Sequence, residues 1–129
     1  MKLESPKVSA SKNQQKMFTF LTDVANYEQI MPSSKEKFEV VSSDKFLFQL
    51  KGMPEIALKI IDTKEPNLVV LGSGSDKFPF TLTIHIDKNG TDSNVQLFFN
   101  GEFNAMMAMM VKGPLQKFIN HLSENISKL

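Results

Sequence analysis

Side chains that can transfer protons or bind a metal ion are few in this sequence and lie far apart. Neither His85 nor His121 belongs to a pair of histidines or carboxylates at spacing i, i+4 with a third ligand, the pattern expected of a metal-binding helix. The chain contains no cysteine, so disulfides, thiolate metal sites and cysteine nucleophiles are excluded. We therefore expect no metal centre, no cofactor and no catalytic residue of these kinds.

A few other polar side chains remain as candidates for chemistry. Asp23, Asn100 and Glu102 are isolated, so a place on the solvated surface is favoured over contact with the head group of a ligand. Tyr27, the only tyrosine, is the first side chain to consider as a proton donor in an enclosed site. The segment Gly72-Ser73-Gly74-Ser75 has no lysine and does not open a helix, so it predicts a turn between strands rather than a phosphate-binding loop.

Length and composition favour one soluble domain over residues 1–129. The 129 residues are 41% hydrophobic and 22% charged, which supplies enough apolar side chains for a core. The formal net charge of +1 gives no electrostatic reason to expect binding to nucleic acid or to an anionic membrane. The first residues lack the apolar stretch of a secretion signal, and no run approaches the roughly 20 apolar residues of a membrane span. We expect a cytoplasmic protein with no integral membrane segment.

The first quarter of the chain predicts a strand followed by two helical pieces. Residues 2–10 alternate loosely, and Pro6 confines them to an edge or an irregular strand. Ser11 and Gln14 have the spacing of a capping box, which predicts a helix with Ser11 as its N-cap. A second short helical turn must end just before Pro32, because proline disfavours the helical conformation in the residue before it. The apolar face of the first helix consists of Met17, Phe20, Leu21 and Val24.

Residues 35–103 follow a period of two and predict six antiparallel strands in a meander. Turn signals such as Ser42-Ser43-Asp44 and Lys88-Asn89-Gly90 separate the segments. The clearest strand places Phe78, Phe80, Leu82, Ile84 and Ile86 on its inner face.

A long helix is predicted from Asn104, its N-cap, to the C-terminus. Pro114 removes a helical hydrogen bond to the Met110 carbonyl, so a kink or a break is expected at Gly113-Pro114. One broad apolar face, which we expect to dock on the sheet, carries Ala108, Val111, Leu115, Phe118, Ile119, Leu122, Ile126 and Leu129.

This order of elements resembles the helix-grip fold of the polyketide cyclase/dehydrase and lipid-transport superfamily, which includes START-related, birch-pollen-allergen-like and small bacterial SRPBCC-type proteins. The residues that carry the resemblance are Leu3 to Pro32, with Phe18, Leu21, Asp23, Tyr27 and Met31-Pro32, and the methionine-rich stretch that leads into Gly113-Pro114-Leu115 and Phe118. The resemblance implies an α+β fold. In it a curved antiparallel sheet of about seven strands wraps round the long C-terminal helix.

The resemblance also implies a cavity between the sheet and that helix, in which members bind lipids, hormones, quinones or polyketides. The positions that carry over as its lining are all apolar: Phe38, Val40, Phe48, Leu58, Phe80, Leu82, Leu97, Phe99, Met107, Met110 and Val111. Proton or acyl chemistry needs a base within hydrogen-bond reach of the reacting atom, so this lining favours binding over catalysis. The expected ligand is small and hydrophobic, such as a lipid, a quinone or a polyketide-like molecule. A cyclase, dehydratase or hydrolase in the same cavity and a non-enzymatic regulator of a partner protein are the alternatives.

Two features of the C-terminal helix have more than one interpretation. Met106, Met107, Met109 and Met110 are flexible side chains that can line or cover a cavity mouth, fill the core, or form a homodimer interface. Gly113-Pro114 is either the hinge of a mobile gate or a static bend that fits the helix to the curved sheet.

Overall fold

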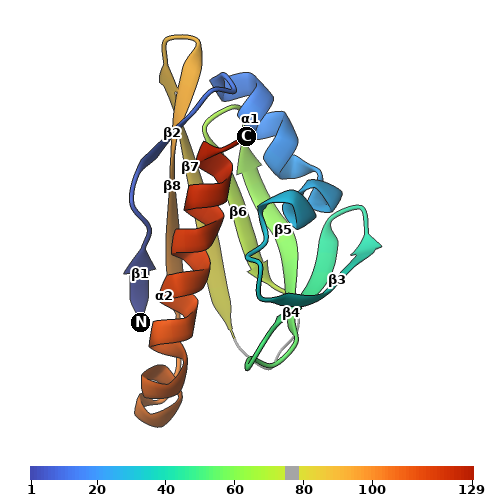
Figure 1. The fold of residues 1–129 in the computed structure, drawn as a ribbon, viewed down its shortest axis with the longest axis vertical. Helices are drawn as coiled ribbons and strands as arrows, with labels where there is room; N and C mark the ends of the chain where they lie inside the picture. Colours follow the sequence, from blue (N-terminus) through green and yellow to red (C-terminus); the bar gives the residue numbers. More distant parts are fainter. Residues whose placement is uncertain (75–78) are drawn as a thin grey trace.

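The computed structural model describes residues 1–74 and 79–129. Within these residues the fold consists of an 8-stranded antiparallel sheet, two short helices and one long helix (Figure 1). The strands are β1 (Lys2–Glu4), β2 (Val8–Ala10), β3 (Lys35–Ser42), β4 (Lys45–Leu50), β5 (Ile56–Lys64), β6 (Leu68–Ser73), β7 (Phe80–Asn89) and β8 (Asp92–Gly101). The helices are α1 (Gln14–Thr22), the 3-10 helix η1 (Val24–Ile30) and α2 (Ala105–Ser127). The predicted α+β architecture, with a meander after a helix pair and a long final helix, is confirmed.

The strands from β3 to β8 lie side by side in chain order, as the predicted meander requires. Across the sheet the order is β1-β8-β7-β6-β5-β4-β3, and β2 also pairs with β8. On β8, buried Val95, Leu97 and Phe99 alternate with less buried neighbours, so the period of two decides which face meets the helices. The predicted inner face of β7 is confirmed for Leu82, Ile84 and Ile86, whereas Phe78 lies outside the described residues.

The glycine- and serine-rich segment that predicted a turn is partly strand. Gly72 and Ser73 belong to β6 and pair with Lys59 and Leu58 of β5. The amide of Gly74 still donates to the Ala57 carbonyl at 2.9 Å. Gly72 and Ser73 therefore lie inside the sheet, because the ladder with β5 satisfies their backbone groups. Ser75 lies outside the described residues.

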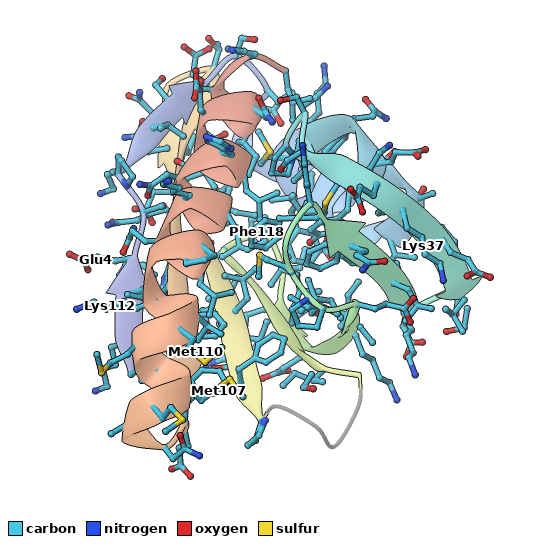
Figure 2. The ribbon with its side chains drawn as sticks, turned by 60° about the horizontal axis from the view of Figure 1, so that its bottom comes forward. Glu4, Lys37, Met107, Met110, Lys112 and Phe118 are labelled. Carbon is cyan, nitrogen blue, oxygen red and sulfur yellow. The ribbon has the colours of Figure 1, made fainter. Side chains whose placement is uncertain are left out.

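The long helix α2 packs on one face of the sheet and runs beside β8 (Figure 1). Its buried residues all lie in its second half. Asn104 is the N-cap, as predicted, since its side chain accepts a 2.8 Å hydrogen bond from the amide of Met107. The helix continues through Gly113-Pro114 without a break. No residue of 105–114 is buried, whereas Phe118 points toward the sheet and Lys112 points away from it (Figure 2). The buried residues of α2 are Leu115, Phe118, Ile119, Leu122, Ser123 and Ile126.

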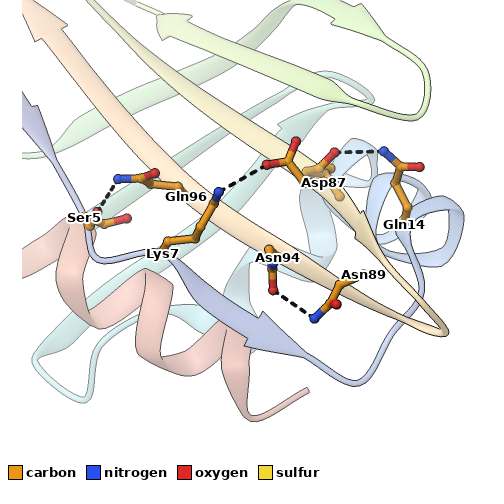
Figure 3. Close-up of polar contacts among 8 residues, drawn as sticks. Ser5, Lys7, Gln14, Asp87, Asn89, Asn94 and Gln96 are labelled. Carbon is orange, nitrogen blue, oxygen red and sulfur yellow. Dashed lines mark hydrogen bonds and ion pairs between the residues drawn. The ribbon is translucent and has the colours of Figure 1, made fainter.

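The predicted N-terminal strand is divided in two at Ser5-Pro6. Glu4 of β1 pairs with Phe98 of β8, and Val8 of β2 pairs with Val95. The N-terminal strand therefore advances four residues while β8 advances three, which is a β-bulge with one extra residue. The amide of Ser5 still donates to the Leu97 carbonyl, and the Ser5 hydroxyl accepts from the Leu97 amide, both at 2.9 Å. Figure 3 shows that Gln96 also donates to the Ser5 carbonyl. Pro6, which has no amide proton, is accommodated in this bulge.

The first helix begins two residues later than the capping-box pattern predicted, and Ser11 is not its N-cap. The side chain of Asn13 accepts from the amide of Lys16 at 2.8 Å, which makes Asn13 the N-cap of α1. Ser11 instead donates to the Leu129 carbonyl, and Gln14 donates to the Ile86 carbonyl of β7 (Figure 3). Long-range contacts of Ser11 and Gln14 thus replaced the local capping box.

Two side chains of α2 donate hydrogen bonds that connect this helix to η1 and to the N-terminal strand. Asn125 donates to the Ile30 carbonyl at the end of η1, and Ser123 donates to the Pro6 carbonyl, both at 3.0 Å. These bonds fix the second half of α2 against η1 and the bulge of the N-terminal strand. None of the described helices is both long enough and apolar enough to cross a membrane.

The cap assignment gives the first prediction. Asn13→Ala removes the acceptor for the Lys16 amide and should lower the free energy of unfolding by about 1 kcal/mol. Ser11→Ala removes only an exposed hydrogen bond and should change it by less than about 0.5 kcal/mol. Urea unfolding followed by circular dichroism measures both. An equal or larger loss in Ser11→Ala would contradict the assignment.

Candidate functional site

An apolar cavity of about 50 Å³ lies between the sheet and α2. Two groups of stacked phenylalanines contribute to its lining. In one group the rings of Phe48 and Phe118 stack with centroids 4.9 Å apart. In the other, Phe99 stacks with Phe80 at 5.3 Å and with Phe103 at 6.3 Å. The complete lining is Phe48, Met53, Pro54, Ile56, Leu58, Phe80, Leu82, Phe99, Phe103, Val111, Leu115 and Phe118.

The position of Phe103 depends on the glycine two residues before it. A Cβ atom on Gly101 would lie 2.8 Å from Cε2 of Phe103 and 3.1 Å from Cε1 of Phe99. Such distances are closer than carbon atoms approach without displacement, so only glycine lets the two rings stack over the end of β8. Gly101 therefore sets where one wall of the cavity stands.

Six of the eleven residues that the family resemblance implied lie in the cavity wall. They are Phe48, Leu58, Phe80, Leu82, Phe99 and Val111. Leu97 is fully buried in the core without lining the cavity, and Phe38 stacks on Phe46 at 5.3 Å on the edge strand β3. Val40 is 46% exposed, also on β3. The ligand-binding role of each residue stays a prediction.

The remaining two implied residues lie on the flank of α2. Met107 is half-buried and Met110 is 68% exposed. Both project from the side of α2 that faces the gap between the helix and the sheet, opposite Lys112 (Figure 2). Neither side chain belongs to the cavity lining.

Sequence reasoning missed six lining residues for different reasons. Phe103, Leu115 and Phe118 were predicted to be apolar positions of their elements, but periodicity alone does not say which inward residue borders empty space. The same applies to Ile56, the first residue of β5, whose apolar character does not show that it borders the cavity. Met53 and Pro54 lie in the turn between β4 and β5, where no periodic signal exists to mark an inward side chain.

The cavity is smaller than a ligand site. Pockets for small molecules commonly measure about 300–1,000 Å³, whereas 50 Å³ suffices for only one or two water molecules. The lining offers such water no polar partner, so the space is expected to be dry. A ligand can enter only if part of the wall moves.

The electrostatics of the site are those of a hydrocarbon interior, because no lining residue titrates. Tyr27 does not reach the cavity. Its ring stacks on Phe46 at 5.0 Å, and its hydroxyl donates to the Leu21 carbonyl at 2.7 Å. Burial raises the pKa of the Tyr27 phenol well above its ordinary value. The hydroxyl is thus committed to holding α1 against η1.

The other polar candidates lie outside the cavity. Asp23 caps η1 by accepting from the amide of Ala25, and His85 packs edge-on against Phe98. Asn100 and Glu102 border a shallow hollow by β6 and β7. In the described part of the chain no three histidine, aspartate or glutamate side chains gather as metal ligands. On β3, a hydrogen bond from Lys37 to Glu55 raises the pKa of Lys37, which is exposed and does not line the cavity.

Comparison with known proteins identifies the fold. No protein-family model and no curated protein matches the chain. A START superfamily protein from Mycobacterium smegmatis matches with a TM-score of 0.72 at 12% identity, over 98% of this chain and 94% of that one. Norcoclaurine synthase from Thalictrum flavum, solved with a transition-state analogue, matches at 0.74 and 15% identity, over 99% and 92%. A conserved protein from Geobacillus kaustophilus matches at 0.70 and 15% identity, over 99% and 93%. The chain has the START-related helix-grip fold.

Tyr27 gives a prediction about alkaline pH. Its folded-state pKa lies above the ordinary value of 10.0, so the stability that depends on the neutral phenol is complete below about pH 10 and falls as the pH rises further. Tyr27 is the only tyrosine and there is no tryptophan, so ultraviolet absorbance reports on this one ring. Tyrosinate absorbance should appear only together with unfolding measured by circular dichroism. Its appearance near pH 10 in a folded protein would contradict the burial of the hydroxyl.

The variant Tyr27→Phe serves as its control. It removes the absorbance signal and leaves the buried Leu21 carbonyl without its donor, which should cost about 1–3 kcal/mol of stability. Urea unfolding at neutral pH measures this loss.

Proposed function

We propose that this helix-grip protein binds a small hydrophobic ligand in the cavity between the sheet and α2. The observation that carries the proposal is a wholly apolar cavity, to which α2 contributes buried Leu115 and Phe118 together with Val111, which lies in a helix segment without a buried residue. A ligand gains the burial of apolar surface on both phenylalanine walls. Lipids, quinones and polyketide-like molecules all have the required character, and a carrier or sensor in the cytoplasm fits such a cargo.

The first half of α2 is the part of the wall that can move to admit a ligand. None of residues 105–114 is buried, and among them only Val111 packs against the core, so displacing this segment sacrifices little apolar burial. Residues 115–126, in contrast, carry the side chains packed in the core. Met53 in the β4–β5 turn and Met107 and Met110 on the helix flank are unbranched, so they can repack around differently shaped molecules.

A protein partner is the second candidate, because the same segment exposes large apolar side chains. Met106 is 75% exposed and Met109 is 85% exposed, and together with Met110 they form a methionine patch at the start of α2. Exposed apolar patches commonly mark contact surfaces. A homodimer through this patch would cover all three side chains. Catalysis in the cavity has less support, since an acid or base would have to come from the ligand or from outside the lining.

Ligand binding is tested with a substitution that fills the cavity. Val111→Phe places a ring in the cavity from α2 and should weaken binding of a neutral apolar probe, N-phenyl-1-naphthylamine, at least about tenfold. Met109→Phe adds a ring to the exposed side of the same helix and should leave the affinity unchanged. Probe fluorescence in a titration measures both. Absence of saturable binding to the unaltered protein would refute the proposal.

Equal weakening by both substitutions would instead indicate that the probe binds the methionine patch. Sedimentation over a range of protein concentrations then tests the second candidate. A dimer that Met109→Lys dissociates would favour it.

The movable wall gives a separate prediction for hydrogen exchange. Amides of residues 105–112 should exchange faster than those of 115–126, and a bound ligand should slow the first group more than the second. Equal protection of the two groups, with or without ligand, would show that Gly113-Pro114 is a static bend and not the hinge of a gate.

A further inference from the structure

A second hollow opens beside the apolar cavity and differs from it in charge. It measures about 330 Å³ and lies between α2, the β4–β5 turn and the segment that follows η1. Three of its residues carry or can carry positive charge: Lys51 in the turn, and Lys117 and His121 one helical turn apart on α2. The complete lining is Pro32, Ser34, Leu50, Lys51, Gly52, Met53, Gly113, Pro114, Lys117, Phe118 and His121, without a carboxylate. We call it the cationic groove.

The positive charge of the groove is not neutralised within the described part of the chain. Ion pairs occupy Lys7, Lys35, Lys37, Lys59 and Lys128, but neither Lys51 nor Lys117 takes part in one. The chain as a whole has a net charge of only +1. The groove therefore has more positive charge than the average surface, and the carboxylates that balance it lie elsewhere on the chain. An anion placed there would meet two ammonium groups and no opposing carboxylate among the lining residues.

The cationic groove and the apolar cavity share two lining residues. Met53 and Phe118 border both, one from the β4–β5 turn and the other from α2. Phe118 is buried and stacks on Phe48, so it forms a fixed partition, whereas Met53 is flexible and half-buried. A molecule that passes Met53 can therefore have its apolar part in the cavity and its polar end in the groove.

The flank of α2 shows the same division along its length. Met107, Met110, Pro114, Lys117 and His121 project on one side of the helix, because these positions recur at steps of three and four residues. Figure 2 places Met107 and Met110 on the side toward the sheet and away from Lys112. The flank thus changes from apolar to cationic on passing Pro114.

We propose that the ligand is an amphipathic anion, with one carboxylate or phosphate head in the cationic groove and an apolar tail or ring system in the cavity. This inference rests on the proposed function and narrows it to a ligand class. Lys51 and Lys117 supply charge-assisted hydrogen bonds from opposite sides of the groove, and the imidazole of His121 and the hydroxyl of Ser34 add donors. A neutral hydrocarbon uses only the cavity.

The groove also offers a position where its charge can be altered without disturbing the core. A Cβ atom on Gly113 would meet nothing within 4 Å. Gly113→Glu extends a carboxylate along the flank toward Lys117, four residues later, which is a favourable helical spacing for an ion pair. Gly113→Gln occupies the same space without the charge. Both substitutions replace glycine in a helix interior and should strengthen the helix.

The test compares two ligands that differ only in their head group. Dodecanoate and dodecan-1-ol, both below their micelle-forming concentrations, displace N-phenyl-1-naphthylamine from the protein, and displacement gives their affinities. Dodecanoate should bind about tenfold more tightly, a modest factor because the lysines are exposed. The preference should shrink in about 1 M salt, where charges are screened within roughly 3 Å.

Variants assign the preference to the groove. Lys51→Gln with Lys117→Gln, and separately Gly113→Glu, should abolish the preference for dodecanoate and leave the affinity for dodecan-1-ol within about twofold. Gly113→Gln measures the effect of the added bulk alone, and the preference for dodecanoate should be smaller in Gly113→Glu than in Gly113→Gln. Lys64→Gln with Lys88→Gln removes two lysines outside both linings and should keep the preference.

The outcomes separate this inference from the proposed function. Equal affinity for the two ligands in the unaltered protein, or a preference that survives loss of both groove lysines, overturns the amphipathic-anion assignment while binding in the cavity stands. Failure of both ligands to displace the probe, or of the probe to bind, overturns the proposed function together with this assignment.

Discussion

The packing of the second half of α2 into the curved sheet is the interaction on which the rest of this structure depends. Leu115, Phe118, Ile119, Leu122 and Ile126 bury their side chains there, and Phe118 stacks on Phe48. Burial of such side chains contributes about 1.5–3 kcal/mol each, far more than any exposed ion pair in the chain. The same packing leaves the first half of α2 outside the core. The cavity lies at the boundary between these two parts of α2, because Val111 lines it from the first half and Leu115 and Phe118 line it from the second.

That division explains how a small cavity and a binding function are compatible. A protein interior without ligand closes to near-crystalline density, because empty apolar space forfeits dispersion contacts. Enclosing a ligand then requires one wall that moves at a small cost in free energy and another that keeps its position. The phenylalanines of β4, β7 and β8 supply the fixed wall, and Val111 of α2 with Met53 and Pro54 of the β4–β5 turn supplies the other. The position of Pro114 between the two halves of α2 coincides with this boundary.

The sequence predicted the fold well because its strongest signals were periodic and local. Alternation identified six strands, and Asn104 marked the start of α2. Ser11, Gln14 and Ser5 were misread or missed because their partners, Leu129, Ile86 and Leu97, lie far away along the chain. The candidate site was predictable only in outline. Inward-facing positions such as Leu82 and Phe99 follow from periodicity, whereas the contribution of Met53 and the volume of the cavity depend on how whole elements pack.

Gly101 connects the packing of this protein to how such proteins can diverge. A single methyl group at this position would collide with Phe103 and Phe99, so any substitution must move an aromatic wall of the cavity. Phe99 belongs to the core, whereas Phe103 is only partly buried against it, so Phe103 is the ring that moves at the lower cost. The shape of the enclosed space therefore depends on the residue at position 101, at the end of β8. A lineage can remodel this cavity by a single inherited replacement, without first evolving a new scaffold.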